Sequence, residues 1–156
     1  MGAVKFYHLT ARSLAEAARP LLTQALGQGW NVMLRGPDPA LLERLDMQLW
    51  LEPREGFLPH GLAGGDHDAL QPVLLGTGAA VNGAKAVMLL AGSPVDPGEA
   101  ALMERVWLLF EGADERQMQA ARAEWKAVVA AGLVAEYWSD ASGRWEMKSS
   151  TGGAAG

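Results

Sequence analysis

The stretch RVWLLFEGADERQMQAARAEWKAVVAAG, residues 105–132, decides the fold. After Arg105 come five apolar residues without interruption, a pattern typical of a short strand buried on both faces. A long helix is then expected over residues 113–131, opened by Asp114 as its N-cap and closed by Gly132. A buried strand that leads into a helix is the repeating unit of sheets with parallel strands.

The same alternation extends outward from this stretch. Ser13 and Glu16 have the spacing of a capping box that opens a first helix, and Pro20 inside that helix predicts a kink or a later start. Asp38-Pro39 and Asp96-Pro97 each place a proline at the first position of a further helix. Strands are expected at residues 4–9, 30–34, 72–75 and 86–90, and a terminal hairpin pairs residues 133–138 with 143–147.

These elements predict one α/β domain over residues 1–148, built as a mostly parallel sheet with helices on both faces and a C-terminal hairpin. The second helix should present an apolar face made by Leu41, Leu42, Leu45, Met47 and the Leu49-Trp50 pair. Residues 52–68 are rich in glycine and proline and are expected to be irregular. Residues 149–156 are small and polar, which favours a disordered tail.

Composition limits the class of protein. The chain has 156 residues, 49% hydrophobic and 20% charged, which indicates a globular domain and not a disordered chain. It has no cysteine, which excludes disulfides and thiolate chemistry and fits a reducing cytosol, so a cytoplasmic protein is expected. No apolar run is long enough for a membrane span. The net charge of −5 argues against direct binding to duplex DNA, so DNA should be reached only indirectly.

A nucleotide site is the first chemical possibility. Gly76 and Gly78 follow a predicted strand, with Gly83 further on. A dinucleotide fingerprint needs G-x-G-x-x-G that runs directly into a helix, whereas residue 81 is Val and the next segment is another strand. Turn glycines are therefore the better interpretation, and a small nucleotide-binding enzyme is kept as the alternative function.

A metal site is the second possibility. His60, Asp66, His67 and Asp68 lie in the glycine-rich loop and could together supply zinc ligands. Their spacing on irregular backbone lacks the i, i+4 arrangement of a helical metal site, and a solvated loop fits them better. We therefore expect no metal, no cofactor and no catalytic residue.

Two groups of aromatic and charged residues suggest protein contacts. Trp50 and Phe57 flank a glycine- and proline-rich stretch, and they either pack back onto the preceding helix or form a docking surface. On the last helix, Arg122, Trp125, Lys126 and Val129 follow the spacing i, i+3, i+4, i+7 and share one face. That face is either solvated, with Trp125 turned into the core, or a site for an acidic peptide with an apolar end.

A long motif in the loop resembles a known family. The pattern Leu49-Trp50-x-x-Pro53-x-x-x-Phe57-x-Pro59-His60-x-Leu62-Ala63-Gly64 is similar to the signature loop of the chi subunit of bacterial DNA polymerase III. Phe6-Tyr7 and the later Arg122-x-x-Trp125-Lys126, which leads to Gly132, also match. The order of elements agrees from about residue 3 to residue 148.

The resemblance implies a Rossmann-like three-layer fold without nucleotide chemistry. It implies a replication adaptor with no activity of its own, inside a holoenzyme that is a nucleotidyltransferase. Chi subunits link the clamp loader to single-stranded-DNA-binding protein by holding the acidic C-terminal tail of that protein. Carried over by position, the peptide site includes Arg122, Trp125 and Lys126. Val129 stands where a further basic residue is expected, and Lys148 or Arg116 are candidates to replace that charge.

The resemblance also implies a second protein interface. In some family members chi binds a small subunit, psi, which tethers chi to the clamp loader. The expected surface in this chain is formed by Trp50, Phe57 and His60. A helicase is an alternative partner for that surface.

Overall fold

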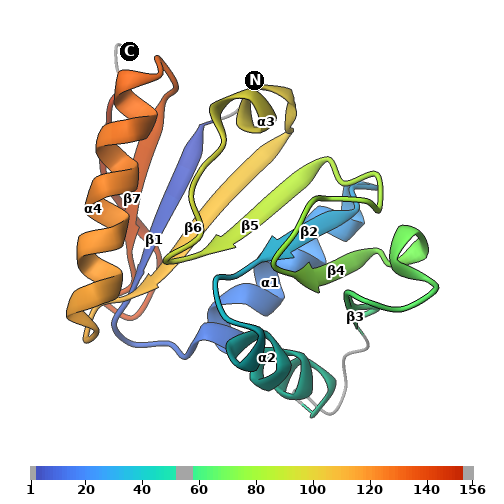
Figure 1. Ribbon diagram of the computed structural model, residues 1–156. Helices are drawn as coiled ribbons and strands as arrows, with labels where there is room; N and C mark the ends of the chain where they lie inside the picture. Colours follow the sequence, from blue (N-terminus) through green and yellow to red (C-terminus); the bar gives the residue numbers. More distant parts are fainter. Residues whose placement is uncertain (1–2, 52–57, 153–156) are drawn as a thin grey trace.

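A computed structural model describes residues 3–51 and 58–152 of the chain (Figure 1). Its strands form one sheet in the order β3-β4-β2-β5-β6-β1-β7-β8. The strands are β1 (Val4–Leu9), β2 (Val32–Arg35), β3 (Gly61–Leu62), β4 (Val73–Gly76), β5 (Ala86–Leu90), β6 (Arg105–Glu111), β7 (Ala135–Ser139) and β8 (Glu146–Ser150). The helices are α1 (Leu14–Gly27), α2 (Pro39–Leu51), α3 (Pro97–Leu102) and α4 (Glu115–Ala130), with a short 3-10 helix at Asp68–Leu70.

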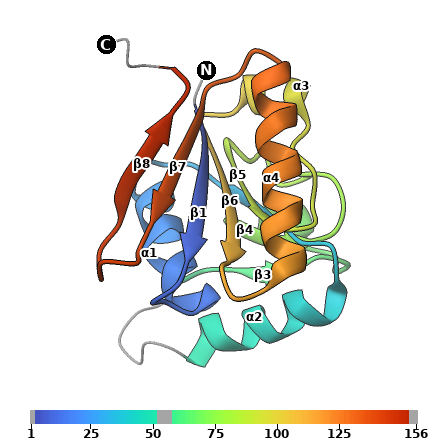
Figure 2. The same cartoon turned by 90° about the vertical axis from the view of Figure 1, so that its left-hand side faces the viewer.

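The sheet is parallel throughout except for the last pair, β7 and β8, which is antiparallel. Helices α1 and α2 cover one face, and α3 and α4 cover the other (Figures 1 and 2). Strand β1 shows how the sequence builds two cores: Tyr7 and Leu9 pack toward α1 and α2, whereas Val4 and Phe6 pack toward α3 and α4. The predicted three-layer α/β sandwich is confirmed.

Local signals explain where α1 begins. Ser13 caps the helix, and its side chain and that of Glu16 make both hydrogen bonds of the capping box. The helix starts at Leu14 and continues through Pro20, so the expected later start is wrong. An interior proline costs about 3 kcal/mol, and the capping box together with a face of buried alanines and leucines outweighs it. Gly29, at φ +84°, takes the left-handed conformation that ends the helix.

Two further expectations need correction. Met47 and Trp50, both predicted on the apolar face of α2, are 60% and 49% exposed, and the buried residues of this helix are Leu42, Leu45 and Leu49. The C-terminal hairpin runs further than expected, because β8 includes Ser149 and Ser150 and the backbone of Thr151 bonds to Ala135. The ordered domain therefore extends past residue 148, and residues 153–156 lie outside the described part of the chain.

The loop after α2 contains more order than its composition indicates. Gly61 and Leu62 pair with β4 as strand β3 at one edge of the sheet. Residues 52–57, which carry Phe57, lie outside the described residues. Within the described ranges, no helix is both long enough and apolar enough to span a bilayer.

Candidate functional site

An open pocket of about 410 Å³ is lined by residues of α4 and of the neighbouring strands β1, β6, β7 and β8. Helix α4 lies against β1, β6 and β7 (Figure 2). Its floor is aromatic and comes from three adjacent strands, with Phe110 from β6, Phe6 from β1 and Tyr137 from β7. The wall on the helix side is made by Met118, Ala121, Arg122 and Trp125 of α4, and Ser149 of β8 also lines the pocket.

The sequence of α4 explains how its side chains reach the pocket. Asp114 starts the helix, because its carboxylate accepts hydrogen bonds from the amides of Arg116 and Gln117 at 2.9 and 3.1 Å. Ala121 and Val128 are buried against the sheet and fix the rotation of the helix. Met118, Arg122 and Trp125 then line the pocket together with Ala121. The helix therefore forms an apolar wall in which Arg122 is the charged group.

Trp125 serves both the core and the pocket. Its indole is half-buried and meets the ring of Phe6 edge-on, with centroids 5.2 Å apart and an interplanar angle of 61°. It also meets the ring of Tyr137 at 6.5 Å and 84°. Edge-to-face packing of this kind holds each ring in a defined orientation. The two interpretations of Trp125 are therefore compatible, since one side of the indole packs inward and the residue still lines the pocket.

A hydrogen-bonded pair stiffens the pocket floor. The hydroxyl of Tyr137 and Nδ1 of His8 are 2.5 Å apart, and the His8 ring stacks on Phe110 at 5.0 Å. Burial raises the pKa of Tyr137, and the positive charges of Arg122 and Lys148 act in the opposite direction. Burial also lowers the pKa of His8, which favours the neutral imidazole. Two cations therefore act on Tyr137, one from α4 and one from β8.

The sequence-predicted helix residues divide into two pairs. Arg122 and Trp125 line the pocket, whereas Lys126 and Val129 are exposed and are not among its lining residues. Lys148 lies one residue from the lining Ser149 and forms an exposed ion pair with Glu146 at 3.1 Å. Arg116 is exposed in the first turn of α4 and is also outside the lining.

The predicted second interface is only partly on the surface. Trp50 is 49% exposed, and its ring lies 4.3 Å from that of His60. His60 itself is buried, with Nδ1 2.6 Å from the carbonyl oxygen of Leu58 and Nε2 3.2 Å from that of Asp46. The solvated-loop interpretation is therefore wrong for His60, although it holds for the exposed His67. Within the described ranges, no group of histidine and acidic residues is arranged to hold a metal ion.

One of the crevices where open α/β sheets usually bind ligands is filled by protein groups. Such sites lie at the carboxyl ends of adjacent strands whose following helices pass to opposite faces, which is true of β2 with β5 and of β6 with β1. The crevice between β2 and β5 is the filled one. Arg35 at the end of β2 forms a two-point ion pair with Glu99 at 2.8 and 3.0 Å and donates to the carbonyl oxygen of Gly78 at 2.8 Å. A Cβ added at Gly92 would lie 2.9 Å from Pro37. Gly78 and Gly83, which follow β4, are therefore interpreted as turn glycines.

The fold and the pocket define a three-layer α/β protein that offers an open aromatic pocket at one end of its sheet. Residues 1–136 match the model of a protein family described as DNA polymerase III chi subunit, HolC. The chain therefore belongs to this family and is an accessory subunit of DNA polymerase III. No curated protein sequence matches it. The matched segment includes Arg122 and Trp125, whereas Tyr137, Lys148 and Ser149 follow it.

Proposed function

We propose that this subunit binds the acidic C-terminal tail of single-stranded-DNA-binding protein in the α4 pocket and links that protein to the clamp loader. The observation that carries the proposal is the combination of an aromatic pocket with one arginine in its lining. A terminal apolar side chain would enter among the rings, and the terminal carboxylate would accept hydrogen bonds from Arg122. As a subunit of the replication machinery, the protein would work in the cytoplasm.

The pocket size limits how much of the tail it holds. Pockets for small molecules span about 300–1,000 Å³. At about 410 Å³ this pocket is near the lower end of that range, so we infer that it holds only the last one or two residues of the tail. The acidic residues before them would then lie on the surface, within reach of Lys126 on α4 and Lys148 on β8. Two or three charge-assisted contacts and one buried ring give about 6–8 kcal/mol net of ordering, which corresponds to micromolar affinity.

The two lysines should make smaller contributions than the arginine. Both are exposed, and ion pairs between exposed groups are worth about 0.2–1 kcal/mol. Lys126→Ala and Lys148→Ala are each expected to weaken tail binding about 2- to 5-fold, measured by fluorescence anisotropy with a labelled peptide. Lys85→Ala, an exposed lysine between β4 and β5, is the matched control and should change nothing. If Lys126→Ala or Lys148→Ala weakened tail binding more than Arg122→Ala does, the larger contribution proposed for Arg122 would be contradicted.

We further propose that the outer face of α2 contacts the clamp loader, either directly or through psi. Met47, Trp50 and Leu51 are 60%, 49% and 67% exposed and follow the i, i+3, i+4 spacing of one helix face. Exposed apolar groups so close together are typical of a protein contact. His60 would support Trp50 from beneath instead of touching the partner. Phe57, which lies outside the described residues, is included in the proposed surface from the sequence alone.

A paired experiment separates the two surfaces. The double variant Met47→Glu/Leu51→Glu is expected to lose capture of the clamp loader, with or without psi, in a pull-down while tail binding stays unchanged. Leu102→Glu is the control, because Leu102 is 83% exposed on α3, on the other face of the sheet. Full capture by the double variant would exclude this face of α2. If the wild-type protein captured a helicase and not the clamp loader, the helicase would be the partner of this face.

A further inference from the structure

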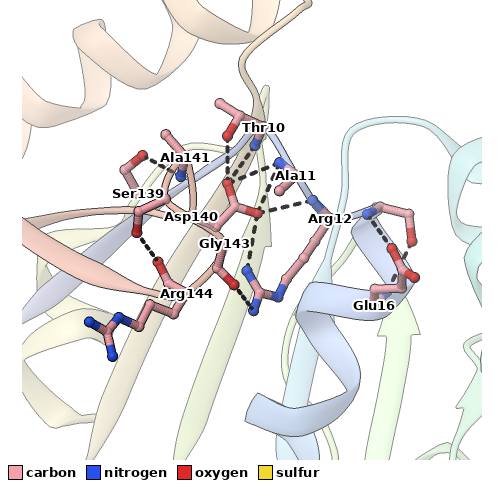
Figure 3. Close-up of polar contacts among 11 residues, drawn as sticks. Thr10, Ala11, Arg12, Glu16, Ser139, Asp140, Ala141, Gly143 and Arg144 are labelled. Atoms are coloured by element: carbon pink, nitrogen blue, oxygen red, sulfur yellow. Dashed lines mark hydrogen bonds and ion pairs between the residues drawn. The ribbon is translucent and has the colours of Figure 1, made fainter.

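A buried carboxylate joins the two ends of the chain. Asp140, in the turn between β7 and β8, is fully buried. Its carboxylate accepts hydrogen bonds from the amides of Thr10 at 2.6 Å, Ala11 at 3.2 Å and Arg12 at 3.0 Å, and from the hydroxyl of Thr10 at 2.9 Å (Figure 3). The guanidinium of Arg12 lies 3.5 Å from the same carboxylate. All of these partners in residues 10–12 are donors.

This arrangement has the form of an occupied oxyanion site. Successive amides that converge on one point create a concave surface that binds anions. Residues 10–12 connect the end of β1 to α1, which is where phosphate-binding α/β sheets hold their ligand. In this chain the anion comes from a residue 130 positions away in the sequence from Thr10.

The same contact fixes a wall of the pocket. Strand β8 is an edge strand held to the sheet through β7, and the turn between them is tied to the first loop by Asp140. Arg12 adds a hydrogen bond to the carbonyl oxygen of Gly143 at 3.1 Å, across the same turn (Figure 3). The hairpin carries Tyr137, in the pocket floor, and Ser149, which also lines the pocket. A loosened turn would therefore change the position of both pocket residues.

We propose that residues 10–12 form an oxyanion-binding site that the chain fills with its own Asp140, and that this internal ligand positions the β7–β8 hairpin for peptide binding. The second part rests on the proposed function, whereas the first does not. Asp140 is a positioning residue, since its carboxylate does not line the pocket.

Chemical rescue tests the oxyanion site. Asp140→Ala should lower Tm by about 5–10 °C, because several charge-assisted hydrogen bonds are lost together. Formate at 100 mM should restore at least half of that loss, while chloride at equal ionic strength should not. Asp140→Asn should also be less stable, yet formate should not rescue it, because the amide fills the space. Wild type and Asp66→Ala, which removes an exposed carboxylate, should not respond to formate. An equal effect of formate and chloride on Asp140→Ala would overturn the assignment.

The wild-type protein offers a second test that needs no variant. Burial alone would raise the pKa of Asp140, but the hydrogen bonds from Thr10, Ala11 and Arg12 outweigh it and hold the pKa below the usual value of an aspartate. The stability that this carboxylate contributes is therefore present above the pKa of the unfolded state and is lost as the pH falls through the lower, folded-state pKa. Among the described residues, Arg12 and His8 are ionisable groups that interact with it. The amide proton resonances of Thr10 and Arg12 should lie downfield at neutral pH and move upfield with that titration. Resonances that stay unchanged while Asp140 titrates would contradict the assignment.

Peptide affinity tests the positioning role. Asp140→Ala should bind the tail peptide at least about 5-fold more weakly than wild type, and formate should bring the affinity back toward that of wild type in the same buffer. Recovery of Tm without recovery of affinity, or an unchanged affinity in the variant, would overturn the positioning role. Absence of peptide binding by the wild type would instead refute the proposed function and leave the rescue result standing.

Discussion

Arg122→Glu is expected to weaken binding of the tail peptide at least about 100-fold while Tm stays within about 2 °C of wild type. Arg122 is the one charged residue among the described side chains that line the pocket. A hydrogen bond to a charged group contributes about 1.5–3 kcal/mol, and a glutamate at this position adds repulsion toward the peptide carboxylate. Because the Arg122 side chain is exposed, its replacement removes little packing.

Calorimetric titration with the tail peptide measures this effect, and three comparisons sharpen it. Arg122→Lys should keep part of the affinity, because lysine retains the charge but loses the two-point geometry. Arg116→Glu, on the same helix but outside the pocket, should bind like wild type. Wild-type affinity should fall as salt rises, and the residual affinity of Arg122→Glu should fall less, because salt also screens the repulsion from the new glutamate. Tail binding by Arg122→Glu at wild-type strength would remove Arg122 from the site.

Trp125→Ala is expected to reduce both peptide affinity and stability. The indole packs edge-on against Phe6 and Tyr137, so truncation removes a wall of the pocket and leaves a cavity above the sheet. Truncation of a buried tryptophan costs about 3–5 kcal/mol, and about half of that is expected here because the ring is half-buried. Peptide affinity should fall at least about 50-fold, since the apolar end of the peptide loses its main aromatic contact.

Urea unfolding and calorimetry on the same sample separate the two effects. Trp125→Phe should recover most of the stability and part of the affinity, because a ring remains against Phe6. Trp30→Ala is the matched control: Trp30 is also half-buried, but it packs against the core on the α1 side. It should lower stability without changing affinity. Equal peptide affinity in Trp125→Ala and Trp30→Ala would show that the peptide binds elsewhere.

The layers of the fold could be predicted from the sequence because their signals are local. The capping box at Ser13, the N-cap at Asp114 and the uninterrupted apolar run after Arg105 each depend on neighbouring residues. The strand order could not be predicted, because pairings such as β1 with both β6 and β7 join segments far apart in the chain. Met47 was misplaced because a leucine-rich helix offers more apolar residues than one face can bury.

Only part of the candidate site could be predicted from the sequence, because only part of it depends on local spacing. Helix spacing alone brings Arg122 and Trp125 together, but it cannot show that the pocket is narrower than the stripe and leaves out Lys126. The aromatic floor arises only when β6, β1 and β7 lie side by side, so Phe110 and Tyr137 gave no signal. His8 could have been found, because it alternates with Phe6 along β1 and so shares its face.

Asp140 shows the limit of local reasoning most clearly. In the sequence it belongs to a short polar segment, Ser139-Asp140-Ala141-Ser142, that indicates an ordinary hairpin turn. Its role depends on the amides of Thr10, Ala11 and Arg12, which come from the opposite end of the chain. A fully buried carboxylate is recognisable as a ligand only once the atoms around it are known to be donors.

The most direct test of the proposed function is calorimetric titration of the full-length protein with a synthetic peptide. The peptide should copy the C-terminal tail of the single-stranded-DNA-binding protein from the same organism. Two companions are needed, one with an amidated C-terminus and one without the last apolar residue. We predict micromolar binding of the free-acid peptide, at least about 10-fold weaker binding of the amide, and no measurable binding of the shortened peptide. Equal binding of all three, or no binding of the free-acid peptide at 100 µM, would contradict it.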